Sequence, residues 1–159
     1  AELLTGLGNF RGTGRRFEVK GTVHGIRVID DYGHHPTEIH VTLEAARRFA
    51  DAGRLIVIFQ PHRYSRTKAF AEQFAKELDV ADRAILLEVY AASEKPIEGV
   101  NSKIITSKMS KGEYIPNFVE VTDSVIGDAQ PGDVIMTLGA GDVSSLAPII
   151  VEGLTRRFA

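Results

Sequence analysis

Three largely apolar runs limit the folds that this chain can adopt. Leu55–Phe59, residues 84–89 and Val134–Leu138 lack the regular polar alternation of a strand with one solvated face, so each is typical of a strand buried on both faces. The segments between these runs carry apolar residues at helical spacing. This alternation of strands and helices predicts an α/β fold with a Rossmann-like, doubly wound and mostly parallel sheet.

Two further strand patterns precede this alternation. Residues 15–22 and 25–30 are expected to pair as an N-terminal β-hairpin, because a turn that contains glycine joins them. Alternation in the second strand places Ile26 and Val28 on one face of the sheet and Ile29 on the other.

Capping residues indicate where the helices begin and end. Pro36 suits the first turn of a helix that Gly53 ends, and Ser65 is the expected N-cap of the next helix. The other expected elements are a loop over residues 90–100, a helix from Asn101 or Ser102 to about Ser110, a short strand over residues 118–121, a brief helix from Asp123 or Ser124, and a last helix that runs to about Arg157.

Composition is typical of a single globular domain. A chain of 159 residues can bury a core, and its net charge of −2 gives no reason to expect a nucleic acid or an acidic membrane surface as partner. No apolar run approaches the roughly 20 residues that span a bilayer, and the absence of cysteine excludes disulfides and thiolate metal sites. Residues 1–14 are glycine-rich and lack an initiating methionine, so we expect them to be the remnant of an interdomain connection and residues 15–159 to be the domain.

The first polar cluster lies between a strand and a helix, where open α/β sheets bind ligands. Its sequence is Asp-Asp-Tyr-Gly-His-His-Pro at residues 30–36. The carboxylates of Asp30 and Asp31 can accept hydrogen bonds from ribose hydroxyl groups or hold a hydrated magnesium ion, and the ring of Tyr32 can face a base. The imidazoles of His34 and His35 can bind a carboxylate or a phosphate. The alternative is that His35 and Thr37 cap the helix and the aspartates are merely solvated; zinc is not expected, because adjacent histidines point in different directions.

The second polar cluster, Gln-Pro-His-Arg-Tyr-Ser-Arg-Thr at residues 60–67, follows the next apolar run. Arg63 and Arg66 are three residues apart at the start of a helix, so both guanidinium groups lie on one side and suit a carboxylate or a phosphate. The alternative is a solvated basic first turn. Positive charge at a helix N-terminus opposes the macrodipole, however, and this favours a bound anion.

A third turn, Gly-Ala-Gly-Asp at residues 139–142, is expected at the same edge of the sheet. It is not a complete G-x-G-x-x-G motif, so tight packing with Asp142 as an N-cap is the alternative. Residues 90–95 also follow a strand, and we leave open whether they join this edge. No phosphate loop of the form G-x-x-x-x-G-K-[ST] occurs in the chain, so ATP chemistry would need another domain.

In this order, and over nearly the whole chain, the motifs resemble the C-terminal domain of the Mur ligases. The resemblance rests on residues 10–12, 15–18, 30–38, 59–67, 90–94 and 139–142. Within the family they are most similar to the member that adds L-alanine to UDP-N-acetylmuramate. Two alternatives remain, namely the tripeptide ligase of the same family and a stand-alone α/β module that binds an anion or a nucleotide.

The resemblance implies a three-domain cytoplasmic ligase of peptidoglycan synthesis, which forms an acyl phosphate with ATP and Mg²⁺. The other two domains would hold the UDP-N-acetylmuramate and most of the ATP and Mg²⁺. This domain alone is therefore expected to be inactive and to hold no metal. It would bring the incoming L-alanine and close over ATP, with no nucleic acid and no membrane insertion.

Matching positions imply a role for each candidate residue. Asp31 and Tyr32 would meet the ribose and the adenine of ATP, and His34 or His35 would lie near the reacting groups. The pocket for the amino-acid carboxylate would be formed by His62, Arg63 and Arg66 and lined by Gly139, Gly141 and Asp142.

Overall fold

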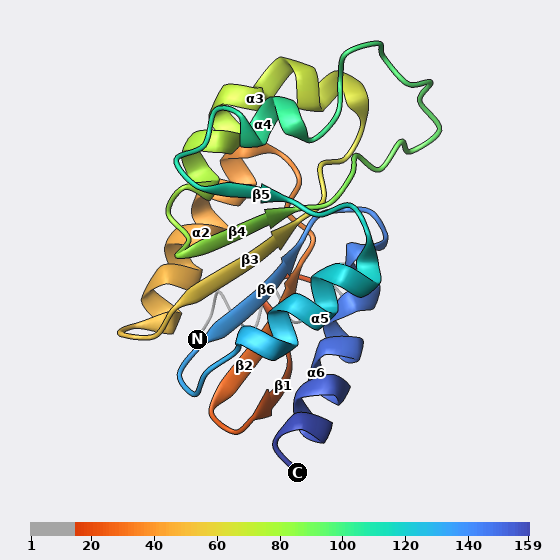
Figure 1. The fold of residues 1–159 in the computed structure, drawn as a ribbon. Coiled ribbons are helices and arrows are strands. Elements are labelled where there is room, and N and C mark those ends of the chain that lie inside the picture. The colour runs from red at the N-terminus through yellow and green to blue at the C-terminus, as the bar shows by residue number, and fades with distance from the viewer. Residues whose placement is uncertain (1–14) are drawn as a thin grey trace.

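A computed structural model describes residues 15–159 as a sheet between two layers of helices (Figure 1). The expected interdomain connection over residues 1–14 lies outside the described residues. The elements are β1 (Glu18–Val23), β2 (Ile26–Asp31), α2 (Pro36–Ala50), β3 (Leu55–Phe59), α3 (Tyr64–Leu78), β4 (Arg83–Leu86), α4 (Lys103–Thr106), β5 (Gly112–Tyr114), α5 (Phe118–Asp128), β6 (Val134–Leu138), the 3-10 turn η2 (Asp142–Ser145) and α6 (Leu146–Arg157).

The sheet confirms the predicted fold class. Its strands lie in the order β1-β2-β6-β3-β4-β5. The β1–β2 pair is antiparallel and forms the expected hairpin, whereas the other pairs are parallel. The last strand in the sequence, β6, therefore lies in the interior of the sheet between β2 and β3.

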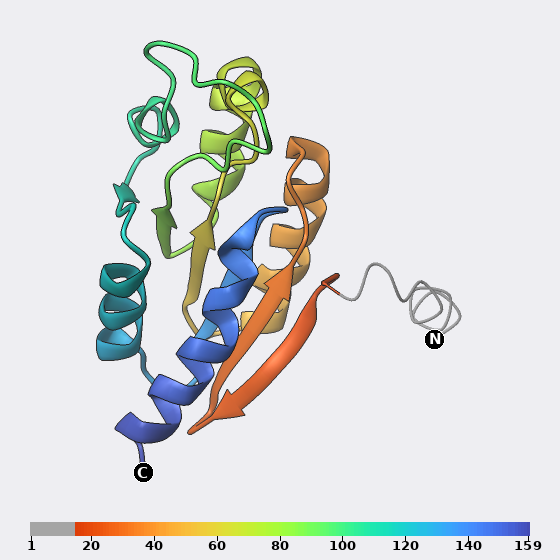
Figure 2. The ribbon, with the colours of Figure 1, turned by 90° about the vertical axis from the view of Figure 1, so that its right-hand side faces the viewer.

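Helices cover the two faces of the sheet (Figure 2). A hydrophobic cluster lies on each face, between the sheet and these helices. Helices α2 and α3 bury Leu43 and Phe74 against one face, and α5 and α6 bury Val125 and Ile150 against the other. All five residues of β3 and all five of β6 are buried, as their apolar runs predicted. Full burial of each large aliphatic side chain contributes about 1.5–3 kcal/mol, so these central strands anchor the fold.

The region between β4 and β6 was predicted wrongly. Residues 118–121 are the first turn of α5 and not a strand, because the Asn117 side chain accepts a hydrogen bond from the backbone N–H of Glu120 and caps the helix there. The expected start at Asp123 or Ser124 is therefore also wrong. The actual edge strand, β5, has only three residues and no fully buried one, so it carries no apolar signal.

Other boundaries differ by a few residues. Helix α2 ends at Ala50 and is followed by Asp51 with φ 52°, so Gly53 lies beyond its end. Strand β4 ends at Leu86, although the chain stays buried through residue 87, and α4 covers only four residues. None of the described helices is both long and apolar enough to cross a membrane.

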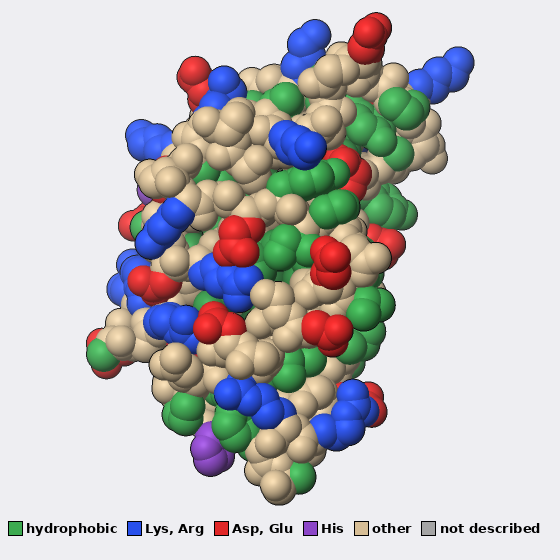
Figure 3. All heavy atoms as spheres, in the orientation of Figure 1, with side chains coloured by type: hydrophobic (Ala, Val, Ile, Leu, Met, Phe, Trp, Pro, Cys, Tyr) green, Lys and Arg blue, Asp and Glu red, His purple; other side chains and the backbone are tan. Residues whose placement is uncertain are grey.

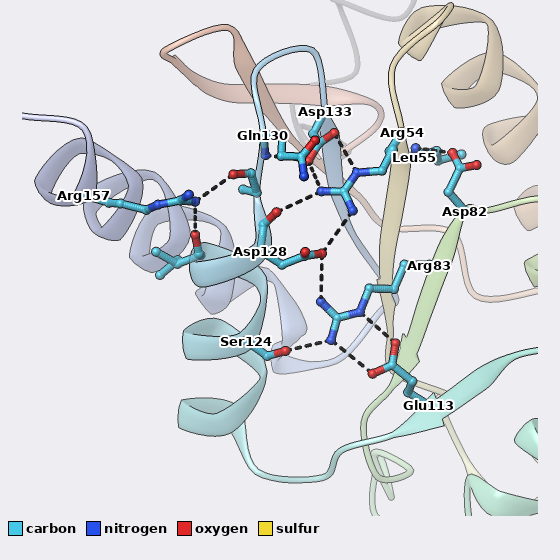
Figure 4. A network of polar contacts seen from close by, with 12 residues as sticks. Arg54, Leu55, Asp82, Arg83, Glu113, Ser124, Asp128, Gln130, Asp133 and Arg157 are labelled. Carbon is cyan, nitrogen blue, oxygen red and sulfur yellow. Dashed lines mark hydrogen bonds and ion pairs between the residues drawn. The ribbon is translucent and has the colours of Figure 1, made fainter.

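Paired charges join the strands at their amino ends (Figure 4). Arg54 binds the buried carboxylate of Asp133 through two nitrogens, at 3.1 and 2.7 Å, and also contacts Asp128 at 3.2 Å. Arg83 makes two hydrogen bonds to Glu113, at 2.7 and 3.0 Å. Basic and acidic side chains also alternate over the face of the molecule seen in Figure 3, in keeping with the small net charge.

Candidate functional site

Four turns meet at the carboxyl edge of the sheet, where β2, β6, β3 and β4 end. Helices α2 and α3 follow β2 and β3 on one face, whereas α6 follows the intervening β6 on the opposite face. Such a reversal of the winding direction is the topological switch point, where open α/β sheets bind ligands. We call this edge the rim.

An aromatic row, defined as Tyr32, His34, His62 and Tyr90, crosses the rim. The ring centroids of Tyr32 and His34 are 5.2 Å apart, those of His34 and His62 are 5.6 Å apart, and those of His62 and Tyr90 are 5.5 Å apart. The last pair is nearly parallel, with an interplanar angle of 14°. Tyr32 and Tyr90 end the row and are 37% and 38% exposed, so their rings are open to a ligand.

The two adjacent histidines of the first turn have different surroundings. His34 belongs to the row, and its Nδ1 lies 3.1 Å from the carbonyl oxygen of Tyr32. His35 is the N-cap of α2, where its Nδ1 accepts a hydrogen bond from the N–H of Thr37, and its ring packs on Phe70 at 5.1 Å. The structure therefore places His35 in the capping role that sequence analysis offered as the alternative, and does not bring it into the row.

Both aspartates of this turn are buried, so the expectation that they could be merely solvated is wrong. The Asp31 carboxylate accepts hydrogen bonds from the N–H groups of Gly33 and Phe17, both at 2.8 Å, and from the hydroxyl of Thr42. Burial raises the pKa of Asp31, although these donors stabilise its charged form. Asp31 thus ties the backbone that follows Tyr32, at Gly33, to the segment that leads into β1, at Phe17.

Arg15 and Arg16 reach the rim although they were not among the predicted site residues. Their guanidinium carbons lie 5.2 and 5.8 Å from the centroid of the Tyr32 ring. Arg15 also donates to Asp30 at 2.8 Å and to the carbonyl oxygen of Gly139 at 2.6 Å. These contacts tie the first turn to the third and place positive charge beside an exposed aromatic ring.

The predicted guanidinium pair has no carboxylate partner among residues 15–159. The side chain of Arg63 is exposed and makes no hydrogen bond or ion pair within this part of the chain, and the residue has a positive φ of 75°. Backbone conformations of this kind cost a non-glycine residue about 1–3 kcal/mol and cluster at functional sites. Arg66 donates through Nη1 to the carbonyl oxygen of His62 at 3.0 Å and approaches His62 Nδ1 at 3.2 Å.

The start of α3 is capped from a distance. Ser65 is not the N-cap, which is Arg63 without a capping side chain. Instead, the Glu94 carboxylate accepts hydrogen bonds from the N–H and the hydroxyl of Ser65. These bonds lower the pKa of Glu94. An anion does occupy this helix start, as the macrodipole argument requires, but it belongs to the chain itself.

The third turn requires glycine at two positions. Gly139 has φ 144°, and a Cβ there would lie 2.7 Å from the carbonyl oxygen of Gln60. A Cβ on Gly141 would lie 2.6 Å from Cγ of Tyr90, so the tyrosine ring packs directly on this glycine. Tight packing, which sequence analysis gave as the alternative, is therefore part of what these glycines do.

Gln60 and Tyr90 are two further site residues that sequence analysis did not assign. The Gln60 amide donates to Asp142 at 2.7 Å and accepts from the N–H of Val143 at 3.0 Å, so it holds the third turn. Asp142 is accordingly not the N-cap; Gly141 is. A buried amide directly after an apolar strand is the signal that could have identified Gln60. Tyr90 carried no comparable signal, because its partners His62 and Gly141 are distant in sequence.

The described residues contain no group of three or more His, Asp or Glu side chains that could hold a metal ion. What the rim offers is two guanidinium groups without a carboxylate partner in the described chain, a row of aromatic rings with Arg15 and Arg16 beside it, and two tight glycine contacts. This set suits an anionic ligand with a flat or small uncharged part, such as an amino acid or a nucleotide.

Comparison with known proteins identifies the class to which this fold and rim belong. Residues 15–141 match the family model described as Mur ligase, glutamate ligase domain, so the chain belongs to the Mur ligase family. It is 49% identical over 160 residues to the UDP-N-acetylmuramate–L-alanine ligase of Mycobacterium ulcerans, and this match covers 98% of the chain. The chain spans about a third of the length of the curated relatives that it matches.

Solved structures give the same result. The UDP-N-acetylmuramate-alanine ligase of Thermotoga maritima is similar with a TM-score of 0.74 and 29% identity, over 99% of this chain and 34% of that one. A murein peptide ligase from Psychrobacter arcticus has the same TM-score over 89% of this chain and 30% of its own, but at 22% identity it shows the fold alone.

Proposed function

We propose that this chain is the C-terminal, amino-acid-binding domain of the ATP-dependent ligase that joins L-alanine to UDP-N-acetylmuramate in peptidoglycan synthesis. The observation that carries the proposal is the pair of guanidinium groups, Arg63 and Arg66, without a carboxylate partner in the described chain and directly beside the aromatic row. The identity of 49% to named L-alanine ligases supports the choice of substrate.

Arg63 and Arg66 would hold the carboxylate of the incoming amino acid. Guanidinium groups bind carboxylates through paired hydrogen bonds, and Arg63 is exposed with all its donors available. His34 and His62 would face the amino acid from the row, while His35, Gly139, Gly141 and Asp142 would shape the surrounding turns. Holding the amine close to its target and excluding water are the contributions that this domain can make to an acyl transfer.

Tyr32 would meet the adenine of ATP, because its exposed ring can stack on a base and Arg15 and Arg16 add positive charge for the phosphates. Asp31 would act at the ribose or through its hold on Tyr32. ATP and Mg²⁺ would be held mainly by a central domain that lies outside this chain, since the sequence has no phosphate loop. The isolated domain would be inactive, and the whole enzyme would work in the cytoplasm, where ATP is found.

The deciding experiment measures ATP-dependent phosphate release by the full-length ligase with UDP-N-acetylmuramate and a panel of L-alanine, glycine, L-serine and the murein tripeptide. Preference for L-alanine supports the proposal. Preference for the tripeptide would keep the fold and the rim but assign the chain to murein recycling. A parent reading frame without a phosphate loop, together with no activity, would favour a stand-alone binding module.

A further inference from the structure

His62 is held more tightly than its place in an exposed turn requires. Its backbone forms a parallel bridge with Tyr90, in which the N–H of Arg63 donates to the Tyr90 carbonyl oxygen at 2.7 Å and the Tyr90 N–H donates to Pro61 at 2.8 Å. The Tyr90 ring stacks on the imidazole and is backed by Gly141 in the turn after β6. The orientation of the imidazole is therefore set by three of the four turns.

The contact with Arg66 determines which imidazole nitrogen carries the proton. An arginine side chain stays protonated in proteins and can only donate hydrogen bonds. Arg66 Nη1 lies 3.2 Å from His62 Nδ1, so Nδ1 must present its lone pair to the guanidinium group. The proton of the neutral ring is then on Nε2. Protonation of Nδ1 would set two N–H groups against each other.

Most of the charged groups around His62 also favour the neutral ring. His34 faces it from the turn after β2, Arg63 and Arg66 face it from the start of α3, and Glu94 faces it from the loop after β4. Burial lowers the pKa of His62 first. His34, when its ring is protonated, and the guanidinium groups of Arg66 and Arg63 lower it further, against a smaller opposing effect of Glu94.

We propose that His62 faces the rim as a neutral imidazole that donates a hydrogen bond through Nε2–H, with Tyr90 and Arg66 as the residues that position it. The group that it recognises is an anionic oxygen, which under the proposed function is the carboxylate of the amino acid. His62 is thus a hydrogen-bond donor and not the base that takes a proton from the incoming amine.

His34 completes the argument because it has the opposite tautomer. Its Nδ1 lies 3.1 Å from the Tyr32 carbonyl oxygen, which only accepts, so the proton is on Nδ1 and Nε2 offers a lone pair. Two rings whose centroids are 5.6 Å apart therefore present one donor and one acceptor. An α-amino acid carries the complementary groups, a carboxylate that accepts and an amino group that donates.

The first test needs no activity. Long-range ¹H–¹⁵N correlation spectra of the ¹⁵N-labelled chain, recorded from about pH 5 to about pH 8, report the tautomer and the titration midpoint of each histidine. We expect the Nε2–H tautomer for His62 and a midpoint below the ordinary 6.5. The signals are assigned with His62→Gln. An Nδ1–H tautomer, or a midpoint at or above 6.5, overturns the proposal.

Two variants test the positioning residues separately. Tyr90→Ala is expected to raise the His62 midpoint toward 6.5, because it admits water to the ring, whereas Tyr90→Phe keeps the stacking and leaves the midpoint in place. Arg66→Met removes the positive charge that lies 3.2 Å from Nδ1, so we expect it to raise the His62 midpoint while the buried core stays intact. His40 is the internal control, since it binds Glu44 and Glu77 on the outer surface of α2 and α3. An unchanged His62 midpoint in Arg66→Met contradicts the role of Arg66.

The second test separates this inference from the proposed function on which it rests. In the full-length ligase, the amide nitrogen of His62→Gln can replace Nε2–H, whereas that of His62→Asn occupies the place of Nδ1. We expect kcat/KM for the amino acid to fall about tenfold in the glutamine variant and about a hundredfold or more in the asparagine variant. Equal losses overturn the donor role. If the wild-type ligase uses no amino acid at all, the proposed function fails, and the spectra still decide the state of His62.

Discussion

The two ends of the sheet differ in how they use arginine. At the amino ends, Arg54 and Arg83 each bind a carboxylate through two nitrogens, and Asp128 lies between the two guanidinium groups (Figure 4). At the carboxyl ends, Arg63 and Arg66 have no carboxylate partner within residues 15–159. Arginine therefore ties strands together at the amino edge, whereas among the described residues of the carboxyl edge only Arg15 and Arg16 pair with carboxylates and Arg63 and Arg66 stay available for an external anion.

The backbone shows the same contrast. At the amino edge Asp133 closes its turn by accepting from Gln130 N–H, and Asp82 accepts from Leu55 N–H, so local structure and charge pairing agree. At the rim Arg63 is kept in a strained conformation by contacts from residues 90–94. We conclude that substitutions at the first edge should cost stability and that substitutions at the second should cost function.

Substitution of Arg63 should cause the largest loss of catalytic efficiency. We expect Arg63→Ala and Arg63→Gly in the full-length ligase to weaken kcat/KM for the amino acid by about 2–4 kcal/mol, because each removes one member of a desolvated charge pair. Arg63→Gly should also raise the free energy of unfolding by up to about 1 kcal/mol, since glycine accepts the positive φ without strain. Steady-state kinetics and urea unfolding measure the two effects.

Lys68→Ala, at an exposed position on the same helix, is the matched control and should change neither quantity. If KM for the amino acid and kcat are unchanged in the Arg63 variants, Arg63 does not bind the amino acid, and the proposed difference in function between the two edges is wrong.

Substitution of Asp133 should lower stability and leave substrate binding unchanged. Asp133→Ala leaves Arg54 and the Gln130 N–H without their buried acceptor, so we expect the free energy of unfolding to fall by about 2–3 kcal/mol. The KM values of the surviving enzyme should not change. Asp128→Ala, whose side chain is 42% exposed, should cost less than half as much, and equal losses would show that burial is not what strengthens this edge.

Asp31 tests how the rim is divided between its ligands. Asp31→Asn keeps an acceptor but loses the charge that the Gly33 and Phe17 N–H groups stabilise, so Tyr32 should lose its fixed position. We expect the KM for ATP to rise about tenfold, or about 1.4 kcal/mol, and the KM for L-alanine to rise less. The reverse order would mean that the first and second turns hold the opposite ligands from those proposed.

The smallest expected effect is on stability, and it depends on pH through the ionisation of His40. Hydrogen bonding and charge interaction with Glu77 raise the pKa of His40 above 6.5 in the folded chain. The interaction of protonated His40 with Glu77 therefore contributes its full stabilisation below pH 6.5, and this stabilisation disappears as the pH rises through the pKa of His40 in the folded chain. Thermal unfolding of the wild type and His40→Ala should differ at about pH 6 and converge by about pH 9; a difference independent of pH would rule out this ion pair.

Prediction from sequence succeeded where burial is uniform. The bounds of β3 and β6 follow directly from their apolar runs, because strands covered on both faces leave no polar residue to confuse the pattern. It failed for residues 112–121, where a partly exposed three-residue edge strand has no pattern and Asn117 starts a helix with an apolar first turn.

At the rim, local motifs predicted that three of the four turns meet and left residues 90–95 open, and they did not predict how the side chains of these turns pair. Glu94 caps α3 from 29 residues away, and Gln60 binds Asp142 across 82 residues. Such contacts depend on the order of strands in the sheet, which spacing along the chain does not encode. The roles of His34, His62, Arg63 and Arg66 toward a ligand remain predictions.

The last strand of the chain fills the middle of its sheet. Strands β2 and β3 are joined only through β6, so they cannot form one sheet until residues 134–138 have left the ribosome. The bond from Thr137 to Asp30 closes a separation of 107 residues, and contacts of this length slow folding. During synthesis, the edge of β2 in the N-terminal hairpin and the edge of β3 in the β3–α3–β4 unit therefore stay unpaired until β6 is available. A ribosome that stalls before β6 would release a chain prone to aggregate.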